Sequence, residues 1–85
     1  MPKKLASDGS KNLIGERIRA LRKEKKLSQE QLIAQLQLMD LDYERGVIKR
    51  IENGTRFVSD IELRILAKFF GVTYDFLIDG EKDLR

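Results

Sequence analysis

The sequence lacks cysteine, histidine and tryptophan, and its only proline is Pro2. Without cysteine the chain can form neither disulfides nor thiolate metal sites, a composition that suits the cytosol. Without histidine it also lacks the most frequent general base and the most frequent ligand of transition metals. Carboxylates remain, but they are scattered along polar faces and do not gather in an apolar pocket. We therefore expect no enzyme activity, no metal site and no cofactor.

Long apolar runs are also missing. No stretch approaches the roughly 20 residues that cross a bilayer, and the N-terminal sequence MPKKLASDGSK has no apolar segment of the kind found in signal peptides. With 85 residues, the chain can build one small core but not a second. Its 41% hydrophobic and 36% charged residues are typical of a compact, helix-rich protein. We expect a single cytoplasmic domain.

The charge is distributed unevenly. Residues 1–26 hold nine Lys and Arg against three acids, a net of +6, whereas residues 27–85 hold eight against eleven, a net of −3. A basic half indicates an anionic partner, with nucleic acid as the first candidate and an anionic membrane surface as the second. The membrane is disfavoured because the basic helix predicted below has no Trp or Phe on its apolar face.

Apolar residues recur at helical spacing along most of the chain, and no segment alternates for long enough to form a strand. Serine or threonine marks helix starts, and glycine marks helix ends. We predict a flexible basic arm over 1–11, a first helix over about 12–25, and a second helix that Ser28 and Gln31 open. A third helix covers about 42–53 and ends at Gly54, and a fourth is opened by Ser59 and Glu62 and ends at Gly71. A fifth helix is opened by Thr73 and ends at Gly80, and a tail covers 80–85. The sequence thus predicts an all-α domain over 12–79.

The third predicted helix divides into two faces when its residues are placed about 100° apart. Val47, Ile48 and Ile51 cluster on the side that we expect to face the core. The opposite side carries Arg45, Gly46, Lys49, Arg50 and Asn53, with Glu52 at the edge between the two. Arginine can pair with guanine, lysine and asparagine can contact bases or phosphates, and a glycine here would let the backbone approach a partner closely. An ordinary solvated helix face with a tolerated glycine explains the pattern equally well.

The surroundings of this helix favour a nucleic-acid partner. Gln29 lies in the first turn of the second predicted helix, where backbone N–H groups and the helix dipole attract phosphate. Asn53, Thr55 and Arg56 supply further donors just after the third helix. Two helices whose ends can hold phosphates, the second with a polar outward face, match the way a helix-turn-helix lies on DNA.

The strings LSQEQLIAQLQL, IKRIENGTR and IELRILAKFFGVTYDFL occur in this order and resemble the DNA-binding domain of the phage Cro and repressor class, often called XRE-like. The resemblance covers about residues 12–79 and implies a lambda-repressor-like fold of five helices, with the second and third as the helix-turn-helix. It also implies a two-fold homodimer on a near-palindromic DNA operator. By matching position and by face, we expect base contacts from Arg45, Gly46, Lys49 and Arg50, phosphate contacts from Gln29, Asn53, Thr55 and Arg56, and a structural pair of Arg22 with Glu52.

The chain departs from this family in the turn between the second and third helices, where Met39–Tyr43 are about five additional residues. This stretch contains acids beside a surface expected to meet phosphates. We predict that Asp42 caps the third helix and that Glu44 lies in its first turn, where negative charge offsets the helix dipole. Met39 and Leu41 are expected to anchor the turn in the core. A second expectation is that Asp40 and Glu44 weaken non-specific binding to DNA.

The sequence therefore favours a sequence-specific transcriptional regulator, most simply a repressor. The alternative is a protein-interaction module on the same scaffold, such as an antitoxin or antirepressor, which would not need an outward face of Arg45, Lys49 and Arg50. The fifth predicted helix carries more apolar surface than one small core needs, which indicates dimerisation. Its apolar residues are Tyr74, Phe76, Leu77 and Ile78.

Overall fold

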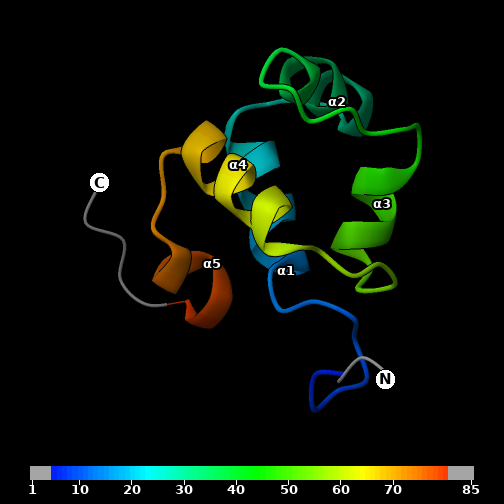
Figure 1. Ribbon diagram of the computed structural model, residues 1–85, viewed down its shortest axis with the longest axis vertical. Coiled ribbons are helices and arrows are strands. Elements are labelled where there is room, and N and C mark those ends of the chain that lie inside the picture. Colours follow the sequence, from blue (N-terminus) through cyan, green and yellow to red (C-terminus); the bar gives the residue numbers. More distant parts are fainter. Residues whose placement is uncertain (1–4, 81–85) are drawn as a thin grey trace.

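The computed structural model describes residues 5–80, and the described part of the chain contains five helices and no strand (Figure 1). The helices are α1 (Gly15–Glu24), α2 (Gln29–Gln37), α3 (Val47–Glu52), α4 (Asp60–Phe70) and α5 (Tyr74–Asp79). The predicted all-α class and the number of helices are confirmed. The outer part of the expected arm, 1–4, and most of the expected tail, 81–85, lie outside the described residues.

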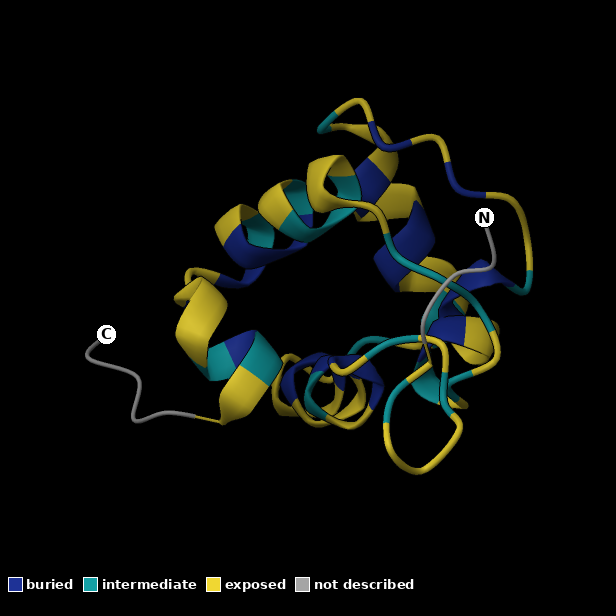
Figure 2. Cartoon of the chain, turned by 60° about the horizontal axis from the view of Figure 1, so that its bottom comes forward, coloured by how far each residue is buried: buried dark blue, intermediate teal, exposed yellow. Residues whose placement is uncertain are grey.

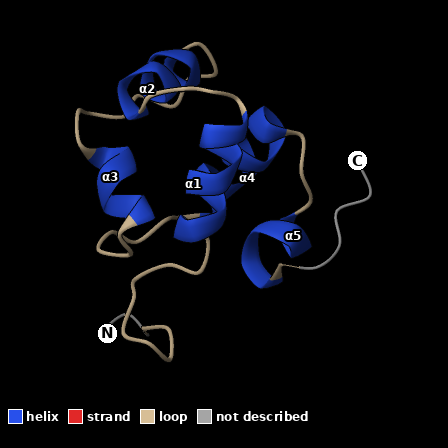
Figure 3. Ribbon diagram, turned by 180° about the vertical axis from the view of Figure 1, so that it is seen from behind, coloured by secondary structure: helices blue, strands red, loops and turns tan. Residues whose placement is uncertain are grey.

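The helices pack around one core. Seen from opposite sides in Figures 1 and 3, α1 and α4 lie over each other in the middle, α2 and α3 lie on one side and α5 on the other. The most extensive contacts between helices are those of α1 with α3, of α2 with α3, and of α4 with α5. Each helix turns its buried residues inward, as Figure 2 shows. The fully buried side chains are Ile18, Leu32, Leu36, Ile48, Ile51, Leu66 and Leu77.

The predicted helix starts and ends are confirmed where local capping decides them. In α2 the Ser28 hydroxyl accepts a hydrogen bond from the Gln31 N–H at 3.0 Å, and the Gln31 side chain accepts one from the Ser28 N–H at 2.8 Å. Ser59 and Glu62 form the same capping box at α4, and Thr73 caps α5. Gly54, Gly71 and Gly80 adopt positive φ at the three predicted helix ends. Each side-chain cap stabilises the fold by about 0.5–2 kcal/mol.

Helix α1 begins at Gly15, three residues after the predicted start, because the Asn12 side chain joins two elements. Its Oδ1 atom accepts from the N–H groups of Ile14 and Gly15, and its Nδ2 group donates to the carbonyls of Ile51 and Arg56. The start of α1 is thereby held against the end of α3. The approach is so close that a β-carbon at Gly15 would overlap the Ile51 carbonyl oxygen, so glycine is required there.

The predicted start of α3 is wrong. Asp42 does not cap this helix, which begins at Val47 after Gly46 at φ +87° and has no side-chain cap. Before it, Leu41 and Tyr43 are buried while Asp42 and Glu44 are exposed, and no regular structure forms. Gly46 has a left-handed backbone conformation that a right-handed helix cannot contain, so a helix over 42–46 could not continue into α3.

Gly46 also lies at the entry into α3 and not on the helix itself. Its left-handed backbone conformation is one that residues with a β-carbon rarely adopt, so it serves the entry into α3. Of the two expected anchors of the lengthened turn, Leu41 is buried and Met39 is partly buried.

The described part of the expected arm forms a turn that lies against the end of α3. The N–H of Ala6 donates to the Ser10 carbonyl at 2.9 Å, and the N–H of Lys11 donates to the Gly54 carbonyl at 2.8 Å. A β-carbon at Gly54 would collide with Ser10. The turn at 6–10 is thus closed by its own hydrogen bonds, and Lys11 joins it to Gly54, just beyond the end of α3.

Candidate nucleic-acid interface

Helix α3 has the two faces that its sequence predicts. Val47, Ile48 and Ile51 are buried, the last two completely, whereas Lys49 and Arg50 are exposed. Because the aliphatic side chains fix one side of the helix in the core, the two cations point toward solvent from the other side. Asn53, the C-terminal cap of α3, is exposed next to them.

Arg45 lies in the turn before α3 and not on the helix itself, which corrects the predicted placement. Its Nε atom is 3.2 Å from a carboxylate oxygen of Glu30 in the first turn of α2, and the two side chains are 89% and 69% exposed. An ion pair this exposed contributes little free energy, because water and salt screen it. Arg45 can therefore exchange Glu30 for another acceptor at small cost.

Arg22 and Glu52 form the expected pair, and it joins three helices. Arg22 Nε donates to Glu52 at 2.7 Å, and its Nη1 donates to the Leu27 carbonyl at 2.8 Å. The hydrogen bond with Glu52 raises the pKa of Arg22, so the guanidinium stays charged. The side chain of Gln29 donates to the same carboxylate at 3.2 Å. Its amide is therefore held inside the protein and does not extend freely toward a phosphate.

The two residues that follow Gly54 also have partners within the protein. Thr55 donates through its hydroxyl to the Arg50 carbonyl at 3.2 Å and so closes the end of α3. Arg56 Nη1 donates to the Phe57 carbonyl at 3.0 Å and to Glu62 at 2.5 Å, and the guanidinium lies 5.1 Å from the centre of the Tyr43 ring. Thr55 is exposed, whereas Arg56 is half-buried.

The sequence did not predict the contact between Tyr43 and Glu62. The hydroxyl of the buried Tyr43 donates to Glu62 at 2.7 Å. Burial is the larger cause that raises the pKa of Tyr43, and this hydrogen bond is the second, so the hydroxyl remains a donor. Burial alone would raise the pKa of Glu62, but hydrogen bonds from Ser59, Tyr43 and Arg56 outweigh it and lower that pKa to about 2. The apolar spacing of Leu41 and Tyr43 was the one local sign of this anchor.

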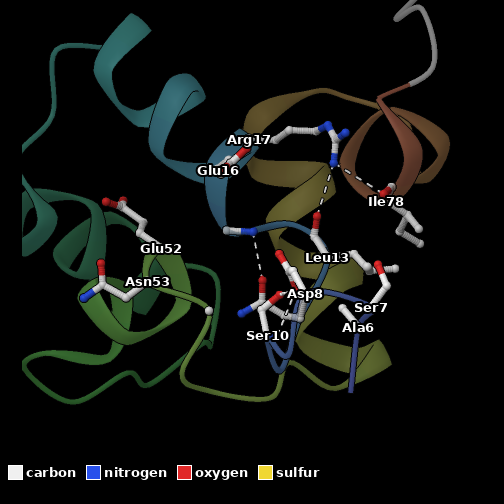
Figure 4. Close-up of a pocket in the computed structure, with 13 residues that line it drawn as sticks. Ala6, Ser7, Asp8, Ser10, Leu13, Glu16, Arg17, Glu52, Asn53 and Ile78 are labelled. Atoms are coloured by element: carbon white, nitrogen blue, oxygen red, sulfur yellow. Dashed lines mark hydrogen bonds between the residues drawn. The ribbon is translucent and has the colours of Figure 1, made fainter. Parts of the chain in front are cut away.

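A polar hollow of about 350 Å³ lies beside the end of α3, between the turn at 6–10, the start of α1 and the end of α5 (Figure 4). Arg17 crosses one side of it, and its Nη1 donates to the carbonyls of Leu13 and Ile78. Asp8 accepts two hydrogen bonds from Ser10, which lower its pKa. The residues around the hollow thus bond mainly to one another, and within 5–80 no group of acids could hold a metal ion.

The sequence profile of a helix-turn-helix domain family matches residues 15–82. No curated protein and no solved structure matches the chain. None of the described helices has the length and apolar character needed to cross a membrane. The matched range contains all five helices. The chain therefore belongs to this helix-turn-helix domain family, which is of the XRE-like type.

Proposed function

We propose that the protein is a sequence-specific DNA-binding regulator in the cytoplasm that represses transcription by occupying an operator. The observation that carries the proposal is the outward cationic surface of Arg45, Lys49 and Arg50 at α3, opposite a face buried in the core. These side chains are long enough to reach base edges when α3 enters the major groove, and arginine can pair with guanine there. Gly46 would let the backbone of the preceding turn come close to the DNA.

The phosphate contacts in this proposal come from the two ends of the helix-turn-helix. The first turn of α2, which Gln29 opens, offers backbone N–H groups, and Asn53 and Thr55 offer exposed polar side chains after α3. Such contacts fix the position of the protein on the duplex without reading its sequence. Arg56 differs from these residues because its guanidinium already has partners within the protein.

The experiment that tests this function is selection of bound sequences from random DNA, followed by titrations at several salt concentrations. We expect one preferred sequence and an affinity that falls steeply with salt, because lysine and arginine displace condensed counterions. Arg50→Ala should cost about 1–3 kcal/mol of binding and relax the preference at particular base positions. Lys68→Ala removes an exposed cation from α4 and serves as the matched control, with little effect expected.

We also propose that two copies bind one operator. Ile61 on α4 is 70% exposed and lies with Tyr74 of α5 in a shallow apolar groove, which Asp60 and Arg64 flank. Two such surfaces related by a two-fold axis can pair the acid of one copy with the arginine of the other. Leu77 cannot take part, because it is fully buried. Sedimentation with and without the selected DNA tests this, and one copy per asymmetric site would contradict it.

A protein-interaction module is the second candidate, and one observation favours it. Leu38 is 86% exposed at the end of α2, next to the turn whose acids Asp40, Asp42 and Glu44 all face solvent. A basic, partly apolar partner would fit that surface. Selection that yields no preferred sequence, together with an affinity indifferent to salt, would favour this candidate over the DNA-binding regulator.

A further inference from the structure

Helix α3 is six residues long and cannot hold its own orientation. A helix shorter than about 12 residues has little intrinsic stability, so its position depends on what it packs against and on the segments at its two ends. The lengthened turn that enters α3 gives the chain additional freedom on that side. Some contact must therefore restrict this turn if Arg45 and α3 are to meet base edges in one orientation.

Both segments that flank α3 reach the same carboxylate. Tyr43, four residues before the first residue of α3, donates its hydroxyl to Glu62 Oε1 at 2.7 Å. Arg56, four residues after the last residue of α3, donates Nη1 to the same oxygen at 2.5 Å. The guanidinium also lies over the Tyr43 ring, an attraction of a cation to an aromatic face. The entry and the exit of α3 are thus joined to each other and to Glu62.

Glu62 is itself held rigidly. Its second oxygen accepts from the Ser59 N–H at 2.8 Å, and its own N–H donates to the Ser59 hydroxyl, so the residue belongs to the capping box of α4. Helix α4 has eleven residues and is anchored in the core through Leu66, Ala67 and Phe70. The carboxylate therefore provides a fixed point from which both ends of α3 are positioned.

We propose that Tyr43, Arg56 and Glu62 form a positioning cluster that sets the orientation of α3 and thereby its discrimination between DNA sequences. This inference rests on the proposed DNA-binding function and assigns Arg56 to positioning instead of phosphate contact. Without the cluster, Val47, Ile48 and Ile51 still hold α3 in the core. The outward cations remain attracted to any duplex, whereas the fixed geometry that base contacts need is lost.

The most conservative test is Tyr43→Phe, which removes one oxygen atom and keeps the buried ring. Against the wild-type protein, affinity for the selected sequence should fall by about tenfold, the scale of one lost base contact. Affinity for random duplex and its dependence on salt should stay unchanged, since no cation is removed. Glu62→Gln keeps a residue suited to the capping box but weakens both contacts, and should lower specific affinity at least as much.

A general loss of stability must be separated from positioning. Val72→Ala shortens a buried side chain between α4 and α5, remote from α3 in sequence, and is the matched control. It should leave the ratio of specific to random affinity unchanged at a temperature where both variants are folded. Tyr43→Phe combined with Arg50→Ala should lose less specific affinity than the sum of the single changes, because both act through the same base contacts.

A measurement without DNA keeps the inference independent of the proposed function. Hydrogen exchange of the α3 amides should accelerate by about tenfold in Tyr43→Phe and stay unchanged in Val72→Ala. If the wild type selects no sequence, the DNA-binding function is overturned, while faster exchange still supports the positioning cluster. If the wild type selects a sequence and Tyr43→Phe keeps both the affinity ratio and the amide protection, the positioning cluster is overturned and the function stands.

Discussion

Two carboxylates hold the candidate interface, and each accepts hydrogen bonds from one arginine side chain and one uncharged side chain. Glu52 meets Arg22 and Gln29 and so joins α1, α2 and α3. Glu62 meets Arg56 and Tyr43 and joins the two segments that flank α3 to the start of α4. The first cluster holds helices to one another, whereas the second holds irregular segments to a helix.

The two clusters differ most in burial. The side chains of Arg22 and Glu52 are 11% and 4% exposed, whereas those of Arg56 and Glu62 are 30% and 16% exposed. A charge left without its partner costs more free energy where water cannot reach it. We therefore expect Glu52 to govern chiefly whether the domain folds, and Glu62 to govern chiefly how α3 is presented.

The largest expected effect comes from Arg22→Met, which removes the guanidinium and leaves Glu52 buried without a cation. The free energy of unfolding should fall by about 3–5 kcal/mol. Urea denaturation followed by circular dichroism measures this loss. Glu52→Gln in the same chain should restore part of the stability, because the uncompensated charge is removed. A loss below about 1 kcal/mol, the size typical of exposed pairs, would contradict the role given to burial.

Arg56→Met is the corresponding change in the second cluster. Water reaches these side chains, so we expect the free energy of unfolding to fall by only about 1 kcal/mol. The same urea experiment compares it directly with Arg22→Met. Equal losses in the two variants would show that burial does not distinguish the clusters. A smaller loss accompanied by weaker sequence discrimination would sharpen the distinction between folding and presentation.

The two clusters also differ in how far they could be predicted. Ser28, Ser59 and Thr73 were identified as caps because a cap and its partner are neighbours in the chain, and their helices were predicted closely. The inward face of α3 followed from helical spacing of Val47 and Ile51. The start of α3 could not be predicted, since the local preference of Asp42 for a cap was outweighed by the left-handed conformation of Gly46 and the contact of Tyr43 with Glu62, 19 residues away.

The same distinction holds for the candidate site. Lys49 and Arg50 lie outward as their spacing predicted, because a helix converts spacing into direction. Gln29 and Arg56 were expected to be available for phosphate, but their side chains bond to Glu52 and Glu62, 23 and 6 residues away. Which polar side chain takes an internal partner depends on the tertiary arrangement, and no local pattern records it.

Titration of Glu62 gives a smaller effect with a defined sign. Its pKa is lowered from an ordinary 4.5 to about 2 in the folded protein, so the ionised form favours folding. This stabilisation is complete above the unfolded value near 4.5 and is lost as the pH falls toward 2. The difference in unfolding free energy between wild type and Glu62→Gln should therefore shrink over that range. The pH range to measure is roughly 5 to 2, which covers both pKa values. If the difference in unfolding free energy stays constant over this range, the carboxylate charge contributes nothing.

The smallest effect is expected for the acids of the lengthened turn, which are a third case beside the two clusters. Asp40 and Glu44 are exposed, and within 5–80 neither side chain has an ion-pair partner. Asp40→Asn with Glu44→Gln should change the free energy of unfolding by less than about 0.5 kcal/mol. Asparagine suits the positive φ of Asp40, so the backbone is not strained.

Binding to DNA should respond even though stability does not. Removing two negative charges from the turn that leads to Arg45 should tighten binding to random duplex by a few-fold at low salt. The gain should be smaller at moderate salt, because screening shortens the reach of these charges. Specific binding should gain less, since base contacts are unchanged, so discrimination should fall. Titration of the selected and random duplexes at two salt concentrations measures both. Unchanged affinity for the selected and the random duplex would mean that the turn lies away from the phosphates. Leu41 and Tyr43 would then be the functional residues of the turn, and the acids would only keep it in solvent.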